Sequence, residues 1–329
     1  MRKKLVFYFL SCIIFLFILE LLVRIAGFKA WESNVNNQET MFRFDNELGW
    51  ISKEGEYLIS STDNTKENKF TIKRDSSRFS GKFEDKTSSK IILIGGSFTQ
   101  GAGVSDKETF AYQLQSLLPN YYVMNFGQAG YGSIQSLILL DQIIKEKVKA
   151  NIVIYGFINH HLRRNVARGE WLETLQRSTN TGFSHKPSIP YGIIDKKDNL
   201  NIKPKTSYLT LPLREKSALI TVVEKIYMKQ TTRHRKKYQM NVFLKTILKM
   251  KTIASKNNIK FIIVNLDLNK NTSDNFLEEI SEENNVNYID CRTPNFKTYK
   301  LQDEYHPNFI GHKHYSECIK NYLNKKLFL

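Results

Sequence analysis

A serine that follows two glycines is the first candidate for chemistry in this sequence of 329 residues. The stretch IILIGGSFTQGAG, residues 91–103, passes from an apolar run into glycines around Ser97. A phosphate-binding loop is the competing interpretation, but no lysine follows the glycines and the spacing of a dinucleotide-binding turn is not met. Glycines beside a serine allow the sharp backbone turn that leaves its hydroxyl accessible and its N–H able to bind an oxyanion. We therefore interpret Ser97 as a candidate nucleophile.

A histidine that could act as the base for this serine lies close to the C-terminus. The segment DEYHPNFIGH, residues 303–312, places Asp303 three positions before His306. On one loop, this spacing lets the carboxylate hold one imidazole nitrogen while the other nitrogen faces the serine. The other six histidines are less well placed: His160 and His161, for example, follow a predicted strand but lack a nearby acid. No cluster has the spacing of a metal site, so we expect no metal and no cofactor.

Donors for an oxyanion are expected at two other strand ends. Gly130 in NFGQAGYG can offer its backbone N–H, because it has no side chain to obstruct a ligand. Asn159, shortly after IVIYGF, can offer a side-chain amide. Together with the N–H of Ser97, these groups could hold the oxyanion that forms when the serine attacks a carbonyl. Ligands of parallel sheets bind at the carboxyl ends of the strands, so we expect these residues to converge.

Alternating strands and helices must position these residues. From residue 90 onward, short apolar runs alternate with segments of helical periodicity. Strands are expected at residues 90–95, 121–127, 151–157, 260–267 and 286–290, and helices at residues 106–118, 133–148, 241–256, 273–283 and 310–323. The first of these helices is expected to have Asp106 as its N-cap. Repeated strand–helix–strand order predicts a three-layer α/β/α architecture with a mostly five-stranded parallel sheet.

The four segments together resemble the four blocks of the SGNH (GDSL-like) hydrolases, which contribute serine, glycine, asparagine and histidine in that order. GGSFTQGAGV resembles the first block, NFGQAGYG the second, GFINHH the third and DEYHPN the last. The resemblance covers about residues 90–325 and implies a flavodoxin-like SGNH hydrolase fold. It assigns catalysis to Ser97, Asp303 and His306, and the oxyanion hole to Ser97, Gly130 and Asn159.

Two positions depart from the family pattern. Gly96 stands where an aspartate usually precedes the serine, and Asn159 comes one residue late and is followed by His160 in place of aspartate. The resemblance implies a serine esterase that acts on ester groups, expected to be O-acetyl groups, of a cell-surface glycan. The same residues would make an O-acyltransferase if a sugar hydroxyl replaced water. The departures motivate a third alternative, a non-catalytic glycan-binding or assembly protein on the same fold.

The N-terminus predicts a membrane anchor. Basic residues 2–4 precede an apolar stretch over residues 5–25, which as a helix would be about 30 Å long. Within it, Glu20 and Arg24 have the spacing of a helical ion pair. The preceding positive charges would stay in the cytoplasm, so we expect a single-pass inner (cytoplasmic) membrane protein with its catalytic domain in the periplasm or outside. A cleaved signal peptide and a lipoprotein modified at Cys12 are the alternatives.

The chain divides into an anchor (1–28), a lead-in segment (29–88) and a hydrolase-like domain (89–329), which carries a long basic insertion at about 160–258. The formal net charge is +17, and residues 196–260 alone hold 14 Lys and 3 Arg against 3 acids. That block is either a solvated face or a surface for an anionic polymer or a lipid headgroup. Because an exported chain rarely meets nucleic acid, we expect no nucleic-acid partner.

Three cysteines bear on the compartment of the domain. Cys12 lies in the expected anchor, which leaves Cys291 and Cys318 in the exported part of the chain. In an oxidising compartment these two could form a disulfide, but two unpaired core thiols are an equally good interpretation.

Overall fold

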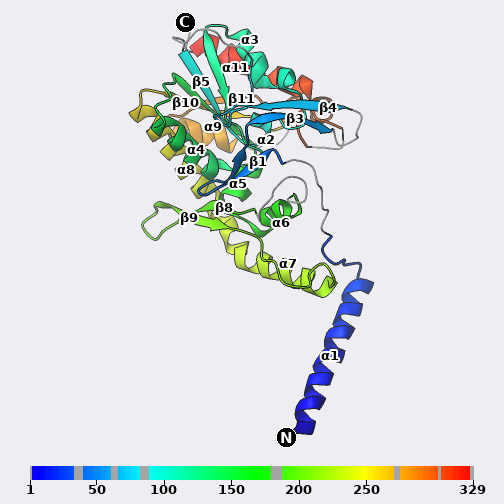
Figure 1. Cartoon of the computed structure of the whole chain (residues 1–329). Helices are drawn as coiled ribbons and strands as arrows, with labels where there is room; N and C mark the ends of the chain where they lie inside the picture. The colour runs from blue at the N-terminus through cyan, green and yellow to red at the C-terminus, as the bar shows by residue number, and fades with distance from the viewer. Residues whose placement is uncertain are drawn as a thin grey trace.

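Five parallel strands form the central sheet of the computed structural model, in the spatial order β11-β10-β7-β5-β6 (Figure 1). The strands are β5 (Ser89–Gly95), β6 (Tyr121–Asn125), β7 (Ile152–Phe157), β10 (Lys260–Asn265) and β11 (Asn287–Asp290). Their continuous apolar runs are typical of a parallel sheet that is covered on both faces. The predicted five-stranded parallel sheet is therefore confirmed. The structure describes residues 2–32, 40–60, 66–81, 89–178, 187–269, 275–302 and 305–326.

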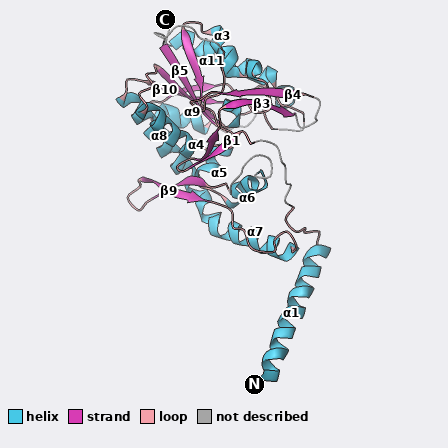
Figure 2. Cartoon of the chain, viewed as in Figure 1, coloured by secondary structure: helices cyan, strands magenta, loops and turns pink. Residues whose placement is uncertain are grey.

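Helices cover both faces of the sheet (Figure 2). One face carries α3 (Phe110–Leu117) and α11 (Phe309–Lys326), and the other carries α4 (Ser133–Lys145), α8 (Gln239–Lys256) and α9 (Phe276–Glu283). Successive side chains of a strand point to opposite faces. Accordingly, Ile91 and Leu93 of β5 pack toward the first pair of helices, whereas Ile92 and Ile94 pack toward the other three. The predicted three-layer α/β/α architecture is confirmed.

The helix that was expected to start at Asp106 begins four residues later. Asp106–Glu108 form a short 3-10 turn, η1, and α3 begins at Phe110 with Thr109 as its N-cap. The carboxylate of Asp106 instead lies 2.9 Å from the guanidinium of Arg78 in the lead-in segment. The expected capping role of Asp106 is therefore wrong, because a charge-assisted partner from a distant segment binds the carboxylate.

Two antiparallel hairpins make up most of the described lead-in segment. They pair β1 (Phe42–Asp45) with β2 (Gly49–Ser52), and β3 (Gly55–Ser60) with β4 (Glu67–Ile72). After β4, the backbone of Arg78 donates to the carbonyl of Asn125, the last residue of β6. The lead-in segment is thereby joined to the edge of the central sheet, close to the carboxyl end of β6.

Between β7 and β10 the chain leaves the three layers and returns with α8. On the way it forms α5 (His160–Asn165), α6 (Gly169–Ser178), the hairpin of β8 (Ile189–Ile194) and β9 (Leu200–Thr206), α7 (Ala218–Arg233) and the 3-10 turn η3 (His234–Tyr238). Figure 1 shows α6, α7 and the hairpin below the sheet, on the side from which the N-terminal helix projects. Much of the predicted basic insertion is thus a folded subassembly that lies next to that helix.

The N-terminal apolar stretch forms one helix, α1 (Arg2–Ile25), that projects away from the domain (Figure 1). None of its described residues is buried. Its 24 residues correspond to about 36 Å, which exceeds the thickness of a bilayer core. By length and composition it is the one helix within the described ranges that could cross a membrane.

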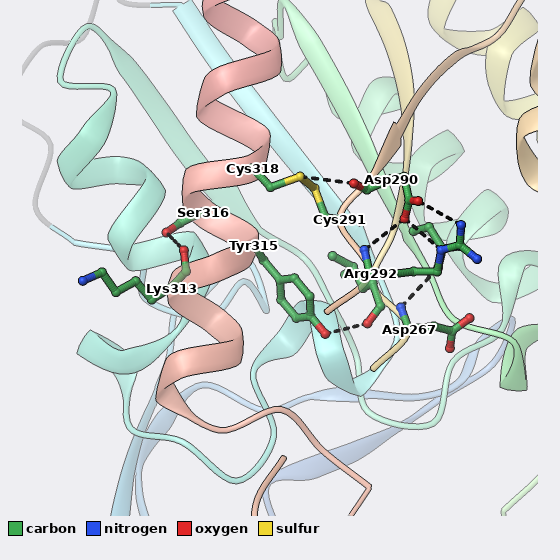
Figure 3. Close-up of a disulfide and its surroundings, with 10 residues drawn as sticks. Asp267, Asp290, Cys291, Arg292, Lys313, Tyr315, Ser316 and Cys318 are labelled. Atoms are coloured by element: carbon green, nitrogen blue, oxygen red, sulfur yellow. Dashed lines mark hydrogen bonds and ion pairs between the residues drawn. A yellow bond between two sulfur atoms is a disulfide. The ribbon is translucent and has the colours of Figure 1, made fainter. Parts of the chain in front are cut away.

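A disulfide joins Cys291 to Cys318 (Figure 3). Cys291 directly follows β11, and its backbone N–H donates to the carbonyl of Asn265 in β10, whereas Cys318 lies on α11. Nearby on α11, the hydroxyl of Tyr315 donates to the carbonyl of Leu266 at 2.6 Å (Figure 3). These contacts fix α11, the helix that follows the DEYHPN segment, against the carboxyl ends of β10 and β11, at one edge of the sheet.

Candidate active site

The nucleophile turn consists of Gly95, which is the last residue of β5, Gly96 and the short helix α2 (Ser97–Gln100). Gly95 has φ +154°, and a Cβ there would lie 2.7 Å from the carbonyl oxygen of Gly156 in β7, so only glycine fits. Ser97 is the first residue of α2, and its N–H therefore has no carbonyl partner within the helix. The turn presents the hydroxyl of Ser97 at the carboxyl end of β5, where a parallel sheet binds its ligands.

His306 reaches Ser97 from a position 209 residues along the chain. Its Nε2 lies 3.0 Å from the Ser97 Oγ, within hydrogen-bonding distance. The loop before α11 holds the ring in place: the Leu301 N–H donates to the His306 carbonyl at 2.8 Å, and the Phe98 ring lies 5.6 Å from the imidazole. The structure thus brings together the predicted nucleophile and the predicted base. Asp303, which was predicted to orient the imidazole, lies outside the described residues.

Gly130 lies in a loop that packs against the nucleophile turn. The Gln128 N–H donates to the Gly95 carbonyl at 3.0 Å, which joins the two segments directly. Gly130 has φ +83°, and a Cβ there would come within 2.9 Å of the Trp50 ring, so both the backbone conformation and the available space require glycine. The structure therefore places Gly130 in the same group of loops as Ser97.

Asn159 lies at the carboxyl end of β7, where it is the exposed N-cap residue of α5. Its backbone N–H donates to the Asp267 carboxylate at 3.1 and 3.2 Å. Asp267 follows β10, so a carboxylate from the neighbouring strand end fixes the start of α5. Sequence reasoning missed this partner, because the pairing depends on β7 and β10 being adjacent in the sheet.

The next residue, His160, is the first residue of α5 and lies in the same part of the site. Its pKa is lowered to about 4, first by desolvation and then by the charges of Arg163, Arg164 and His306. His160 is nevertheless exposed at the surface, within electrostatic range of His306. The sequence analysis set His160 aside as a catalytic base because no acid lies nearby in the sequence. In the structure, the turn from β7 into α5 brings it to the carboxyl end of β7.

Directly behind the nucleophile turn lies a buried polar chain that the sequence did not reveal. The His161 Nδ1 is 2.5 Å from the Tyr155 hydroxyl, which in turn is 2.5 Å from the Ser133 hydroxyl. The His161 Nε2 points at Gly96 and has no hydrogen-bond partner in the part of the chain that the structure describes. Burial, and then the charge of Arg164, hold the pKa of His161 well below its usual value, so the ring is neutral.

The guanidinium of Arg164 is the second group behind the turn. It donates to the Tyr131 carbonyl at 2.9 Å and lies over the Trp171 ring at 4.4 Å. A Cβ on Gly96 would stand 3.3 Å from its Nη1. Burial, followed by the charge of Arg163, lowers the pKa of Arg164 to about 9, so the group remains protonated at pH 7. A positive charge thus lies where the SGNH pattern has a carboxylate.

Arg78 of the lead-in segment holds the other end of α2. Its side chain is fully buried and donates to four main-chain carbonyls in addition to the Asp106 carboxylate. Three of these carbonyls belong to the last residue of α2 and the segment that follows it: those of Gln100 at 3.1 Å, Gly101 at 2.5 Å and Val104 at 2.7 Å. Arg78 therefore links the lead-in segment to the nucleophile turn, and sequence reasoning did not single it out.

A cleft of about 530 Å³ opens beside His306. Its walls come mainly from the lead-in segment, the residues around the end of α2 and the loop before α11, and Ala129 of the loop that carries Gly130 completes them. Most of the wall is apolar and includes Phe42, Ile59 and Phe309. Lys300 adds a positive charge, whereas Lys66 forms an ion pair at 2.6 Å with Glu108, which also lines the cleft. The cleft can take a ligand with both an apolar part and polar or negative groups.

Within the described ranges, no group of three or more His, Cys, Asp or Glu residues is arranged to hold a metal ion. What the loops do bring together is a hydroxyl, an imidazole and main-chain N–H groups. Such a set can carry out acyl transfer through a covalent intermediate without further groups. The site is therefore of the serine-hydrolase type, on a three-layer α/β/α fold.

No protein-family model matches this chain, and no curated protein does. Similar solved structures include a member of the lipolytic G-D-S-L family from Veillonella parvula, with 13% identity and a TM-score of 0.41 over 73% of this chain and 99% of that one. A GDSL-like lipase from Bacteroides thetaiotaomicron has 13% identity and a TM-score of 0.38 over 75% of this chain and 93% of that one. The esterase EstA from Pseudoalteromonas sp. has 12% identity and a TM-score of 0.39 over 72% of this chain and all of that one. The first two bear the name of the family that the sequence blocks resemble.

Proposed function

We propose that the protein is a membrane-anchored serine esterase that removes ester-linked acyl groups, O-acetyl groups in particular, from a cell-surface glycan. The observation that carries the proposal is the 3.0 Å separation between the Ser97 Oγ and the His306 Nε2 at the carboxyl end of β5. This is the distance at which an imidazole can accept the hydroxyl proton. The largely apolar cleft beside His306, with Lys300 in its wall, offers space for the ester and for the sugar that carries it.

The first half of the proposed reaction forms an acyl-enzyme. His306 accepts the proton of Ser97 as the Ser97 Oγ bonds to the ester carbonyl carbon, and the carbonyl oxygen becomes an oxyanion. The N–H groups of Ser97 and Gly130 and the amide of Asn159 would hold this oxyanion, and each such donor is worth roughly 3 kcal/mol. The bond to the sugar oxygen then breaks, and the imidazolium returns its proton to that leaving oxygen. Asp303 would hold the imidazole in the required tautomer.

The second half consumes water. His306 accepts a proton from water, the hydroxide bonds to the acyl carbon, and Ser97 leaves with the proton from the imidazolium. If a sugar hydroxyl attacks in place of water, the acyl group is transferred, so the O-acyltransferase alternative uses the same residues. A non-catalytic glycan-binding protein would use the cleft without either step.

The extracytoplasmic location is part of the proposal. It is supported by the disulfide between Cys291 and Cys318, because such bonds persist in oxidising compartments. The basic residues before α1 support the same orientation, with the N-terminus in the cytoplasm.

Hydrolysis of a chromogenic acetyl ester by the purified full chain in detergent tests the proposal. We expect turnover that Ser97→Ala reduces to background and that Ser116→Ala, a control at an exposed serine of α3, leaves unchanged. A fluorophosphonate should label the wild type and fail to label the Ser97→Ala variant. Absence of both turnover and labelling in the wild type would refute catalysis and favour the binding protein. A further assay separates the esterase from the O-acyltransferase. When an acetylated glycan is supplied together with a second glycan as acceptor, an esterase releases acetate, whereas a transferase moves the acetyl group to the second glycan.

A further inference from the structure

One face of α7 carries apolar side chains that no part of the described chain covers. Val223, Ile226 and Tyr227 are 46%, 54% and 52% exposed, and Ile226 and Tyr227 follow Val223 by three and four residues, which places all three on one side of the helix. The opposite side is buried against α6 and the segment before α7, through residues such as Thr221 and Met228. The side that faces the protein also holds Glu224 and Thr232, so the exposed apolar side chains of α7 lie on the side that faces away from the rest of the chain.

The start of α7 is fastened to the end of α1. The Glu20 carboxylate, one turn before the end of α1, accepts the N–H groups of Ala218 and Leu219 at 3.0 and 2.9 Å and the Ser217 hydroxyl at 2.6 Å. These are the first N–H groups of α7, which need an outside acceptor. Arg24 completes the junction by donating to Glu20 at 2.6 Å and to the Lys216 carbonyl at 2.8 Å.

This junction sets the height of α7 relative to a membrane that contains α1. Charged side chains such as Glu20 and Arg24 are stable near the boundary of the hydrocarbon core and costly within it. The start of α7 therefore lies at that boundary, and Figure 1 shows α7 running across the end of α1, between α1 and the rest of the domain. A helix in this position with an uncovered apolar face meets the headgroup region of the bilayer.

The charge of the same segment matches an anionic lipid surface. Residues 216–238 hold seven Lys or Arg and one acid, Glu224, whose carboxylate is buried beside Arg214. Lys229, Arg233 and Lys236 are exposed at the end of α7 and in η3. Basic residues that flank an apolar helix face are typical of helices that lie in the membrane interface.

We propose that α7 and η3 form a second membrane contact, in which Val223, Ile226 and Tyr227 enter the interface of a leaflet with anionic headgroups and the flanking basic residues bind those headgroups. With α1 as the first contact, the domain then has a fixed orientation on the bilayer and does not swing on a single tether. The proposal depends on α1 spanning the membrane and is independent of the esterase activity.

Depth measurements on the full chain in single-copy nanodiscs test this contact. Cys12→Ser removes the free thiol of α1, after which Tyr227→Cys or Leu58→Cys supplies one labelling site. Leu58 is a matched control, because it is 68% exposed and apolar but lies on the β3–β4 hairpin, away from α1 (Figure 2). With a fluorophore at the cysteine and nitroxide-labelled lipid in phosphatidylglycerol-containing discs, we expect several-fold stronger quenching at position 227 than at position 58.

The charge contribution has its own comparison. Lys229→Gln, Arg233→Gln and Lys236→Gln together should reduce the quenching at position 227, as should discs of phosphatidylcholine alone. The matched triple Lys107→Gln, Lys256→Gln and Lys313→Gln, at exposed lysines elsewhere, should leave it unchanged.

Three results would overturn the proposal. Equal quenching at positions 227 and 58 would show that α7 does not touch lipid. A label at position 227 that is shielded from water but not quenched by lipid would indicate a protein partner in its place. Absence of quenching at the native Cys12 would show that α1 does not enter the bilayer, which removes the premise.

Discussion

Replacing Gly96 by alanine tests why the aspartate of the family pattern is missing. Gly96 has a φ of −90°, which any residue can adopt, so the backbone conformation does not require glycine here. The space does: an added Cβ would stand 2.7 Å from the His161 Nε2 and 3.3 Å from both the Arg164 Nη1 and the Tyr131 oxygen. We therefore expect Gly96→Ala to act through His161 and not through backbone strain.

The size of the effect follows from how little the neighbours can move. The closest contact is about 0.7 Å short of the 3.4 Å at which ordinary contact begins. The ring of His161 is fully buried and is held from behind by the Tyr155 hydroxyl, so relief requires a shift of the nucleophile turn itself. Overpacking of this kind costs about 1–3 kcal/mol of unfolding free energy. Since a misplacement of about 1 Å at a reacting group can cost 10²-fold, we expect kcat/KM to fall between about 10-fold and 100-fold.

Urea unfolding and ester hydrolysis would measure both effects on the wild type, Gly96→Ala, His161→Ala and the double variant. If His161 is the obstacle, the double variant Gly96→Ala/His161→Ala should be more stable than the sum of its single variants predicts, by about 1 kcal/mol or more. A second comparison isolates charge: Gly96→Asp should be more stable than the equally large Gly96→Asn, because its carboxylate would pair with Arg164. A Gly96→Ala variant with wild-type stability and activity would refute the reasoning.

Three further predictions concern the framework of the site. Arg78→Met should lower the unfolding free energy by about 3–5 kcal/mol in urea titration, because it leaves the Asp106 carboxylate buried without its partner. Acid should destabilise the fold: burial, and then neighbouring charges, lower the pKa of His312 to about 3, and its Nδ1 accepts the Phe110 N–H, so the native ring stays neutral while the unfolded ring takes up a proton. This one group should cost about 2 kcal/mol between pH 6.5 and pH 5, and His312→Gln should flatten that slope of stability against pH. Cys318→Ser should lower stability by about 3 kcal/mol in thermal or urea unfolding, since the lost disulfide closes a loop of 27 residues.

The sheet could be predicted because its signal is local. Runs such as IILI, IVIY and FIIV are rich in apolar residues, and each is closed within a few residues by glycine or a polar side chain. The positions of Ser97 and His306 follow from the same signal, since the first comes directly after a strand and the second precedes a helix. Their convergence then follows from the rule that loops at the carboxyl ends of parallel strands share one edge.

The supporting residues could not be predicted, because nothing in their local sequence distinguishes them. Arg78 and Arg74 both lie in the polar segment KRDSSRF, yet Arg74 is exposed and Arg78 is fully buried beneath carbonyls that follow α2. The adjacent pair Arg163 and Arg164 divides in the same way, into a half-buried side chain and one that lies behind the nucleophile. These roles depend on which distant segments meet, and that information is absent from residue type and spacing.

The charge behind Ser97 changes what the missing aspartate means for catalysis. A carboxylate at residue 96 would lie close to a developing oxyanion and would oppose it unless it were neutralised by hydrogen bonds. Gly96 instead leaves room for the protonated guanidinium of Arg164 and the neutral ring of His161. A buried positive charge at this position favours an oxyanion, as do the N–H groups at the start of α2, and it is weakly screened there. The departure from the G-D-S pattern therefore alters the electrostatics of the turn in the direction that the proposed esterase requires, and it gives no physical reason to regard Ser97 as inactive.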